Sequence, residues 1–137
     1  MWTLISALIV PLVSYAAPQT WTIGNDEIKR SMSFSEASGL LTEQLSDLRT
    51  HTDFVLHSKP HYNMPQEFSF QCNGHSYSGS GPQFALVSAG WVPLPNGKSL
   101  TLRLRSKELA LEVSVIYTVY DGHPAIRKHL VLRNPAR

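Results

Sequence analysis

A two-residue alternation of apolar and polar side chains is the feature that most constrains this fold. The clearest run covers residues 99–105, where the alternating side chains are Leu100, Thr101, Leu102, Arg103, Leu104 and Arg105. Successive side chains of a β-strand point to opposite faces, so the run predicts a strand with one buried and one solvated face. Residues 109–120 continue the pattern, with apolar side chains at every odd position. Two such strands indicate an antiparallel sheet.

The rest of the chain reads in the same way. Gly, Pro and Asn separate six further segments that we expect to be strands, namely Ile28–Phe34, Leu40–Leu45, Glu67–Phe70, His75–Ser78, Phe84–Val92 and Ala125–Arg133. Residues 35–48 have a competing interpretation as a helix, because Leu41, Leu45 and Leu48 recur at spacings of four and three, although Gly39 disfavours it. Closely spaced strands without a convincing long helix predict an all-β fold, an antiparallel β-sandwich.

Three dipeptides predict tight hairpin turns between these strands. They are Asn73-Gly74, Asn96-Gly97 and Asp121-Gly122, each flanked by β-rich segments. Asn-Gly and Asp-Gly tolerate the positive φ angles that a two-residue type I′ turn requires at both positions. We therefore expect three two-residue hairpins.

Length and charge limit the function classes. The chain has 137 residues, enough for one domain with a packed core. Its 12 basic and 10 acidic side chains give a net charge of only +2, without a dense basic run. This balance gives little electrostatic reason to expect nucleic acid, and we predict no nucleic-acid partner.

The N-terminus resembles a secretory signal peptide. The first 25 residues carry no charged side chain, and Leu4–Ala17 is an apolar stretch that closes on small residues. Ser14 and Ala16 favour cleavage after Ala16, which gives a signal peptide over residues 1–16 and a mature domain over 17–137; cleavage after Ala17 is the alternative. The start lacks Lys and Arg, unlike a typical signal. A membrane anchor is the other interpretation, but this stretch is shorter than the ~20 residues that span a bilayer. We expect export to the periplasm or the extracellular space.

Cysteine and histidine offer little chemistry. Cys72 is the single cysteine and cannot form an intrachain disulfide, and we interpret it as a half-buried strand thiol. His57 and His61 have the spacing of zinc ligands on a helix, but Pro60 disfavours a helix there. We therefore expect neither a metal site nor a cofactor.

Candidate catalytic and binding residues are also few. Glycoside hydrolysis needs two carboxylates across the scissile bond, and those available are Asp26, Glu27, Glu36, Asp47, Asp53 and Glu67. Sequence spacing on a β-fold does not pair them, so we interpret them as solvated strand ends and turns and predict no catalytic residue. The segment 79–82 lacks the elbow motif of serine hydrolases. Trp91, where a strand meets a proline-broken loop, is a candidate platform for a sugar ring, against the alternative of a core or rim tryptophan.

The C-terminal segment YDGHPAIRKHLVLRN resembles part of the N-terminal β-sandwich domain of family 36 glycoside hydrolases, the α-galactosidase-like enzymes. The matching positions are Tyr120, Asp121, Gly122, Pro124, Ile126, Arg127, Lys128 and Asn134. A weaker similarity covers the opening strands, from Gly24-Asn25 through Gly39-Leu40-Leu41-Thr42 to Thr52-Asp53-Phe54.

The resemblance implies a galactose-mutarotase-like supersandwich, here incomplete, whose family continues into a (β/α)₈ barrel that carries the catalytic aspartates. On this basis the chain is expected to be a non-catalytic support for such a barrel. The implied partners are the barrel of the same polypeptide, a galactoside and further copies of the chain. The alternatives are a stand-alone secreted carbohydrate-binding or adhesion sandwich and a small hydrolase. An incomplete sandwich exposes apolar strand edges, so we also expect self-association.

Overall fold

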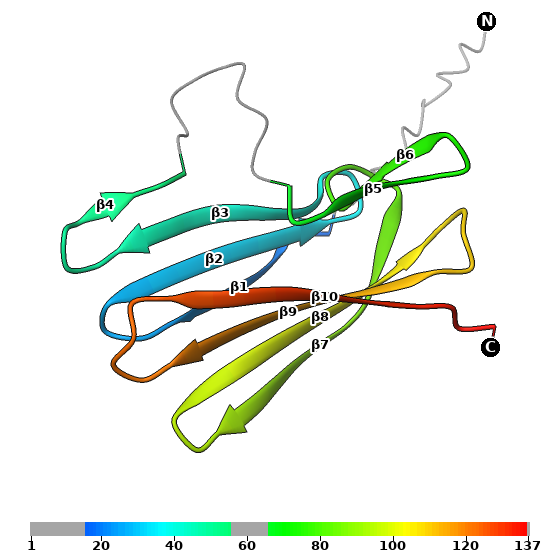
Figure 1. Ribbon diagram of the computed structural model, residues 1–137. Coiled ribbons are helices and arrows are strands. Elements are labelled where there is room, and N and C mark those ends of the chain that lie inside the picture. Colours follow the sequence, from blue (N-terminus) through cyan, green and yellow to red (C-terminus); the bar gives the residue numbers. More distant parts are fainter. Residues whose placement is uncertain (1–15, 56–65, 137) are drawn as a thin grey trace, which may run out of the picture.

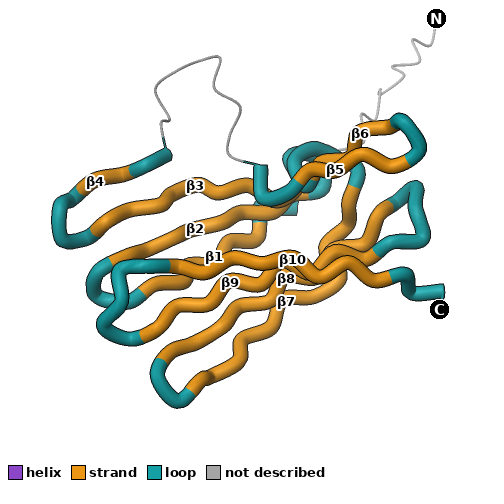
Figure 2. The backbone as a smooth tube through the Cα atoms, in the orientation of Figure 1, coloured by secondary structure: helices purple, strands orange, loops and turns teal. Residues whose placement is uncertain are grey.

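The computed structural model describes residues 16–55 and 66–136, and every regular element within these ranges is a β-strand (Figures 1 and 2). The strands are β1 (Gln19–Gly24), β2 (Ile28–Ser35), β3 (Gly39–Asp47), β4 (Thr52–Asp53), β5 (Ser69–Cys72), β6 (His75–Ser78), β7 (Phe84–Leu94), β8 (Gly97–Ser106), β9 (Glu112–Tyr120) and β10 (Ile126–Arg133). The all-β prediction is confirmed. Within these ranges no helix is long and apolar enough to cross a bilayer.

The strands form two four-stranded antiparallel sheets and one small hairpin. Sheet one has the order β1-β2-β3-β4, and sheet two has the order β10-β9-β8-β7. The hairpin β5-β6 lies at one end of the two sheets (Figure 1). All pairings are antiparallel, and the arrangement is sandwich-like because one core cluster draws side chains from both sheets.

The alternating pattern of the sequence builds this core. Sheet two contributes the inward side chains Leu100, Leu102, Leu104, Val113, Val115, Tyr117 and Val119, each at most 1% exposed. Sheet one contributes Ile23, Met32, Phe34 and Leu40. Beneath the hairpin, the ring of Phe68 meets that of Phe84 edge to face at 5.1 Å. Tyr77 and Phe70 stack at 5.4 Å and complete this end of the core.

Sheet one differs from the prediction in three places. Strand β1 is not among the predicted strands. It pairs with β2 in a register that sets Trp21 opposite Met32. The two-residue strand β4 was also not expected. The helix alternative for residues 35–48 is wrong, because this segment forms a turn followed by β3, which pairs with β2 along its length. A bulge at Glu43 breaks the two-residue period of β3, and this accounts for the helix-like leucine spacing.

All three predicted hairpins form, and the turn at Asn73-Gly74 is confirmed; the second turn is shifted by one residue and the third connection is longer than two residues. Cys72 pairs with His75, and the φ angles of Asn73 and Gly74 are 50° and 77°, as a two-residue turn with positive φ requires. At the second site Leu94 pairs with Gly97, so the turn residues are Pro95 and Asn96.

At the third site, β9 and β10 are joined by a longer loop. Val119 pairs with Ile126, and of the loop residues between them Gly122 has a positive φ of 69°. Pro124 lacks the N–H that a tight hairpin ladder needs. The side chain of Asn25 donates to the carbonyl oxygen of Tyr120, the last residue of β9, and to that of His123 in this loop.

The two edge strands of sheet two carry exposed apolar side chains. On β7 these are Val87, Trp91 and Val92, and on β10 they are Leu130, Val131 and Leu132, with exposures between 38% and 53%. The register places Trp91 beside Leu100 and Leu132 beside Val113, both of them core residues. Trp91, Leu130 and Leu132 therefore extend the inner, apolar face of sheet two to edges that are in contact with solvent.

Candidate functional site

A buried ionic cluster lies between the two sheets, centred on Glu67. The Glu67 side chain has no solvent exposure. Arg30 on β2 donates from Nη2 to both of its carboxylate oxygens, at 2.8 and 3.0 Å. The hydroxyls of Thr42 on β3 and Tyr117 on β9 also donate to this carboxylate. Lys128 on β10 donates from Nζ to the backbone carbonyl oxygen of Glu67, at 2.8 Å. Side chains of four strands thus converge on one carboxylate.

The strand register explains this convergence. Arg30 lies on the face of β2 that also carries Ile28, Met32 and Phe34, so its guanidinium points into the sandwich. The guanidinium carbon lies 5.2 Å from the centre of the Tyr117 ring. Lys128 likewise occupies an inward position of β10, opposite Tyr117.

The electrostatics keep Glu67 ionised. Burial alone raises the pKa of the carboxyl, but the Arg30 charge and the hydrogen bonds from Thr42 and Tyr117 together lower it below its ordinary value. Burial and the Glu67 charge raise the pKa of the Tyr117 hydroxyl well above 10. Glu67 is therefore a carboxylate and Tyr117 a neutral donor across the physiological pH range.

This cluster is closed to substrate chemistry. A general acid or base must reach the atom that gains or loses a proton. The Glu67 oxygens already accept hydrogen bonds from four side chains and are shielded from solvent. The interpretation of Glu67 as a solvated strand end is wrong: it is a buried anchor that ties the segment before β5 to both sheets.

The other five candidate carboxylates occupy turns and strand ends, as expected. Asp26 and Glu27 lie in the β1–β2 turn and Glu36 in the β2–β3 turn, whereas Asp47 and Asp53 lie at the ends of β3 and β4. Cys72 is half-buried on β5, which confirms its interpretation as a strand thiol. His57 and His61 lie outside the described residues. Among the residues described, no group of three His, Cys, Asp or Glu side chains is arranged to hold a metal ion.

A second ionic arrangement lies on the outer face of sheet two. The Glu112 side chain is 2% exposed, and its two oxygens accept hydrogen bonds at 2.6 Å from Nη2 of Arg105 and of Arg133. The strand register sets these three residues side by side across β8, β9 and β10. Hydrogen bonds from Arg133 and Arg105 lower the pKa of Glu112 to about 2.

Trp91, the predicted sugar platform, is on edge strand β7 with 48% of its surface exposed. On the same face of the strand its neighbours are Ala89 and Pro93, and Leu100 lies beside it on β8. The ring is accessible, as a platform for a sugar must be. These immediate neighbours are apolar, whereas sugar sites combine an aromatic face with polar anchors.

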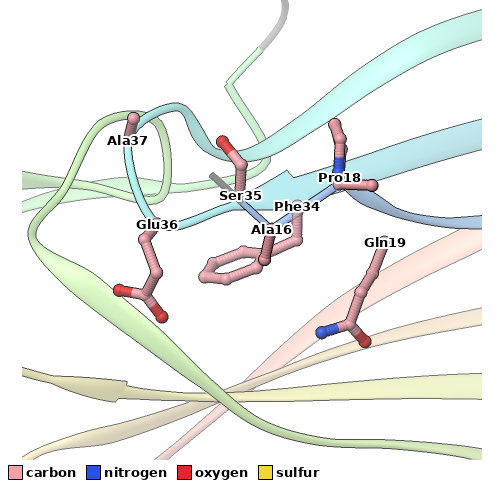
Figure 3. A pocket seen from close by; sticks show the side chains of 8 residues that line it. Ala16, Pro18, Gln19, Phe34, Ser35, Glu36 and Ala37 are labelled. Carbon is pink, nitrogen blue, oxygen red and sulfur yellow. The ribbon is translucent and has the colours of Figure 1, made fainter. Parts of the chain in front are cut away.

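An open, mainly apolar pocket of about 670 Å³ lies at the start of the described chain (Figure 3). Two segments line it, residues 16–19 before and within β1 and residues 34–37 at the end of β2. Phe34 lies within the lining, and Glu36 stands at its side (Figure 3). The Glu36 carboxylate lies 2.8 Å from Nζ of Lys107. Its volume suits a small molecule, but among the described residues that line it only Gln19, Ser35 and Glu36 are polar.

The sequence carries a signal for the buried cluster in two charged residues at inward strand positions. A charged residue at an inward position of a strand must be paired when buried. Arg30 lies between Ile28 and Met32 in the alternating pattern, and Lys128 lies between Ile126 and Leu130. The identity of their partner could not be read in this way, because Glu67 is distant from both along the chain.

No protein-family model matches this sequence, and no curated protein matches it.

Proposed function

We propose that this chain is the non-catalytic N-terminal β-sandwich portion of an exported α-galactosidase-like glycoside hydrolase. In this role it supports a (β/α)₈ catalytic barrel of the same polypeptide that lies outside the sequence. The proposal starts from the resemblance at Tyr120–Asn134, and one structural observation supports it.

That observation is the exposure of apolar side chains along both edges of sheet two. Leu130, Val131 and Leu132 on β10 are 39 to 53% exposed, and Trp91 and Val92 on β7 are about half exposed. Bare apolar edge strands favour pairing with another chain or segment, and soluble domains usually cover them. A support domain that packs against a neighbouring domain needs such a surface. The closed Glu67 cluster fits the same role, because it stiffens the sandwich and offers no reactive group.

The decisive experiment is to sequence the coding DNA beyond codon 137. The proposal expects an in-frame barrel, and the longer protein should hydrolyse a nitrophenyl α-galactoside that this chain alone leaves intact. A stop codon directly after codon 137 would overturn the proposal, and so would turnover by this chain alone.

Variants of the longer protein then test the supporting role. Leu130→Ser/Leu132→Ser should lower the melting temperature of the barrel by several degrees, because the variant removes apolar contact at the edge of sheet two. The matched control is Ser76→Ala/Gln71→Ser on the exposed hairpin β5-β6, which should leave the melting temperature unchanged. Equal effects of the two variants would contradict a contact through β10.

The accessible ring of Trp91 favours a second candidate, a secreted carbohydrate-binding sandwich. Titration with galactosides should then change the tryptophan fluorescence of the chain, and Trp91→Phe should abolish the change. Trp21→Phe is the matched control, since Trp21 packs against the core. No change at millimolar galactoside would exclude this candidate.

A further inference from the structure

The outer face of sheet two carries a concentration of arginines that the proposed function does not use. Strand alternation turns Lys128 inward to Glu67, and it therefore turns Arg127 and Arg133 of β10 outward. On β8 the inward leucines leave Arg103 and Arg105 on the same outer face. We call these four arginines, together with the outward side chains that lie between them on β8, β9 and β10, the arginine face.

This face has a strong positive charge. Its four arginines are opposed by one carboxylate, Glu112, within the three strands, all of which the structure describes. The remaining outward side chains of the three strands are uncharged or histidine: Ser99, Thr101, Ser114, Ile116, Thr118, Tyr120, His129 and Val131. Three positive charges thus remain on one sheet face, although the whole chain has a net charge of only +2.

Glu112 holds two of the arginines in place and leaves their other donors free to bind. It accepts hydrogen bonds from Nε and Nη2 of Arg105 and from Nη2 of Arg133, whose side chains remain 57% and 62% exposed. Arg103 is the next outward residue on β8, and its Nε is buried without a hydrogen-bond partner among the described residues. Because Glu112 already fixes the guanidinium groups of Arg105 and Arg133, they lose less conformational freedom when they bind an anion.

The spacing of the arginines selects an extended ligand with several charges. Arg105 and Arg133 are two strands apart, about 10 Å at the usual strand spacing. Arg127 and Arg133 are separated by about 20 Å along β10. A single phosphate cannot reach both ends of this face, whereas a linear polymer with repeated anionic groups can. Carboxylate and sulfate groups are suited to the planar donor pairs of arginine.

The side chains between the arginines distinguish among polyanions. Proteins that bind single-stranded nucleic acid stack its bases on aromatic rings. The outward residues between the arginines include Ser114 and Thr101 and no Phe, Tyr or Trp. Tyr120, the next outward residue of β9, lies at the end of the face beside Arg127, so the face offers one ring rather than a row of rings for stacking. We propose that the arginine face binds a linear acidic polysaccharide through the sulfate or carboxylate groups of its sugar units. This inference is independent of the proposed hydrolase role.

Binding of defined oligosaccharides to the purified chain tests the proposal. A heparin dodecasaccharide and an oligogalacturonate of equal length supply the sulfate and carboxylate arms, and the readout is calorimetric titration at low salt. We expect at least one to bind, with an affinity that falls as salt is raised. Failure of both to bind would overturn the proposal. Binding of single-stranded DNA of equal charge with the same affinity would overturn it as well.

A charge-matched pair of variants locates the site. Arg103→Gln/Arg127→Gln leaves the Glu112 ion pairs intact and should weaken binding by about tenfold or more. The control Arg49→Gln/Lys107→Gln removes the same charge elsewhere and should change affinity by less than about twofold. An equal loss in both variants would overturn the proposal, since it would mean attraction to net charge alone. If the double variant has a lower melting temperature than the unmodified chain, the single variant Arg127→Gln at an exposed position replaces it. Its affinity should then fall by about threefold, and an unchanged affinity would overturn the proposal.

Discussion

The side chain of Asn25 binds the backbone of Tyr120 across the two sheets. Its Nδ2 donates to the carbonyl oxygen of Tyr120 at 2.7 Å and to that of His123 at 2.8 Å. Its Oδ1 accepts from the backbone N–H groups of Glu27 and Ile28 in its own turn. One side chain therefore shapes the β1–β2 turn and fastens it to the β9–β10 loop.

Asn25→Ala should lower the free energy of unfolding by about 2 kcal/mol, because it leaves part-buried donors and acceptors without partners. Urea unfolding at neutral pH measures this change. Asn96→Ala, in the exposed β7–β8 turn, is the control and should stay within about 0.5 kcal/mol of the unmodified chain. Equal stability of the Asn25 variant would mean that the contact across the sheets contributes nothing.

Glu67→Gln should be among the most destabilising single changes. It removes the charge that compensates Arg30, and breaking a buried ion pair from one side costs roughly 3–5 kcal/mol. Thermal and urea unfolding both report it. Glu36→Gln breaks the exposed ion pair with Lys107 and should cost less than about 1 kcal/mol. A small effect at Glu67 would contradict the role of this residue as an anchor.

Acid should destabilise the fold through the two buried carboxylates with lowered pKa values, Glu67 and Glu112. Such a group stabilises the folded state above its unfolded pKa, and this contribution is lost as pH falls toward its folded pKa. For Glu112 the window runs from an ordinary value of 4.5 down to about 2. The urea midpoint should therefore fall steadily below pH 4.5. Glu112→Gln and Arg133→Gln should each make this fall shallower, and an unchanged slope would contradict the assignment.

Two glycines of one hairpin should respond oppositely to a methyl group. At Gly97 an added Cβ would lie 2.1 Å from the carbonyl oxygen of Val119 and 3.0 Å from Cα of Tyr120. Gly97→Ala should therefore cost about 1–3 kcal/mol or more, because strand backbone must move. At Gly90 nothing lies within 4 Å, so Gly90→Ala should be neutral or slightly stabilising. Urea unfolding of the two variants compares them directly, and similar losses would contradict the β8–β9 register.

Self-association should depend on edge strand β10. We expect the chain to sediment as a concentration-dependent mixture, and Leu132→Lys should shift it toward monomer, because a lysine on an edge strand opposes pairing. Gln71→Lys on the hairpin adds the same charge away from this edge and is the control. A single monomer peak for the unmodified chain would contradict the expectation.

The sequence predicts the core of sheet two well and its connections poorly. Leu100, Leu102 and Leu104 reveal their strand because burial on one face imposes a two-residue period. Turns depend on which residues pair, and the period alone does not determine that pairing. Gly97 looked like a turn residue, but it is a glycine because Val119 passes close to it in the adjacent strand.

The ionic cluster shows a stronger limit. Arg30 and Lys128 are recognisable as inward charges from their apolar neighbours. Their partner, Glu67, lies in irregular chain before β5, where no period marks a buried position. Its role follows only from the tertiary packing of two sheets, which local sequence does not encode.

The opposite directions of Arg127 and Lys128 have a consequence for how the chain finds its native pairing. A slip of β10 by one residue against β9 would expose Leu130 and Leu132 on the arginine face and turn Arg127, His129 and Arg133 into the apolar interior. Such a misaligned state would have to desolvate unpaired guanidinium groups. The alternating charges of β10 thus destabilise shifted registers and favour the native alignment during folding.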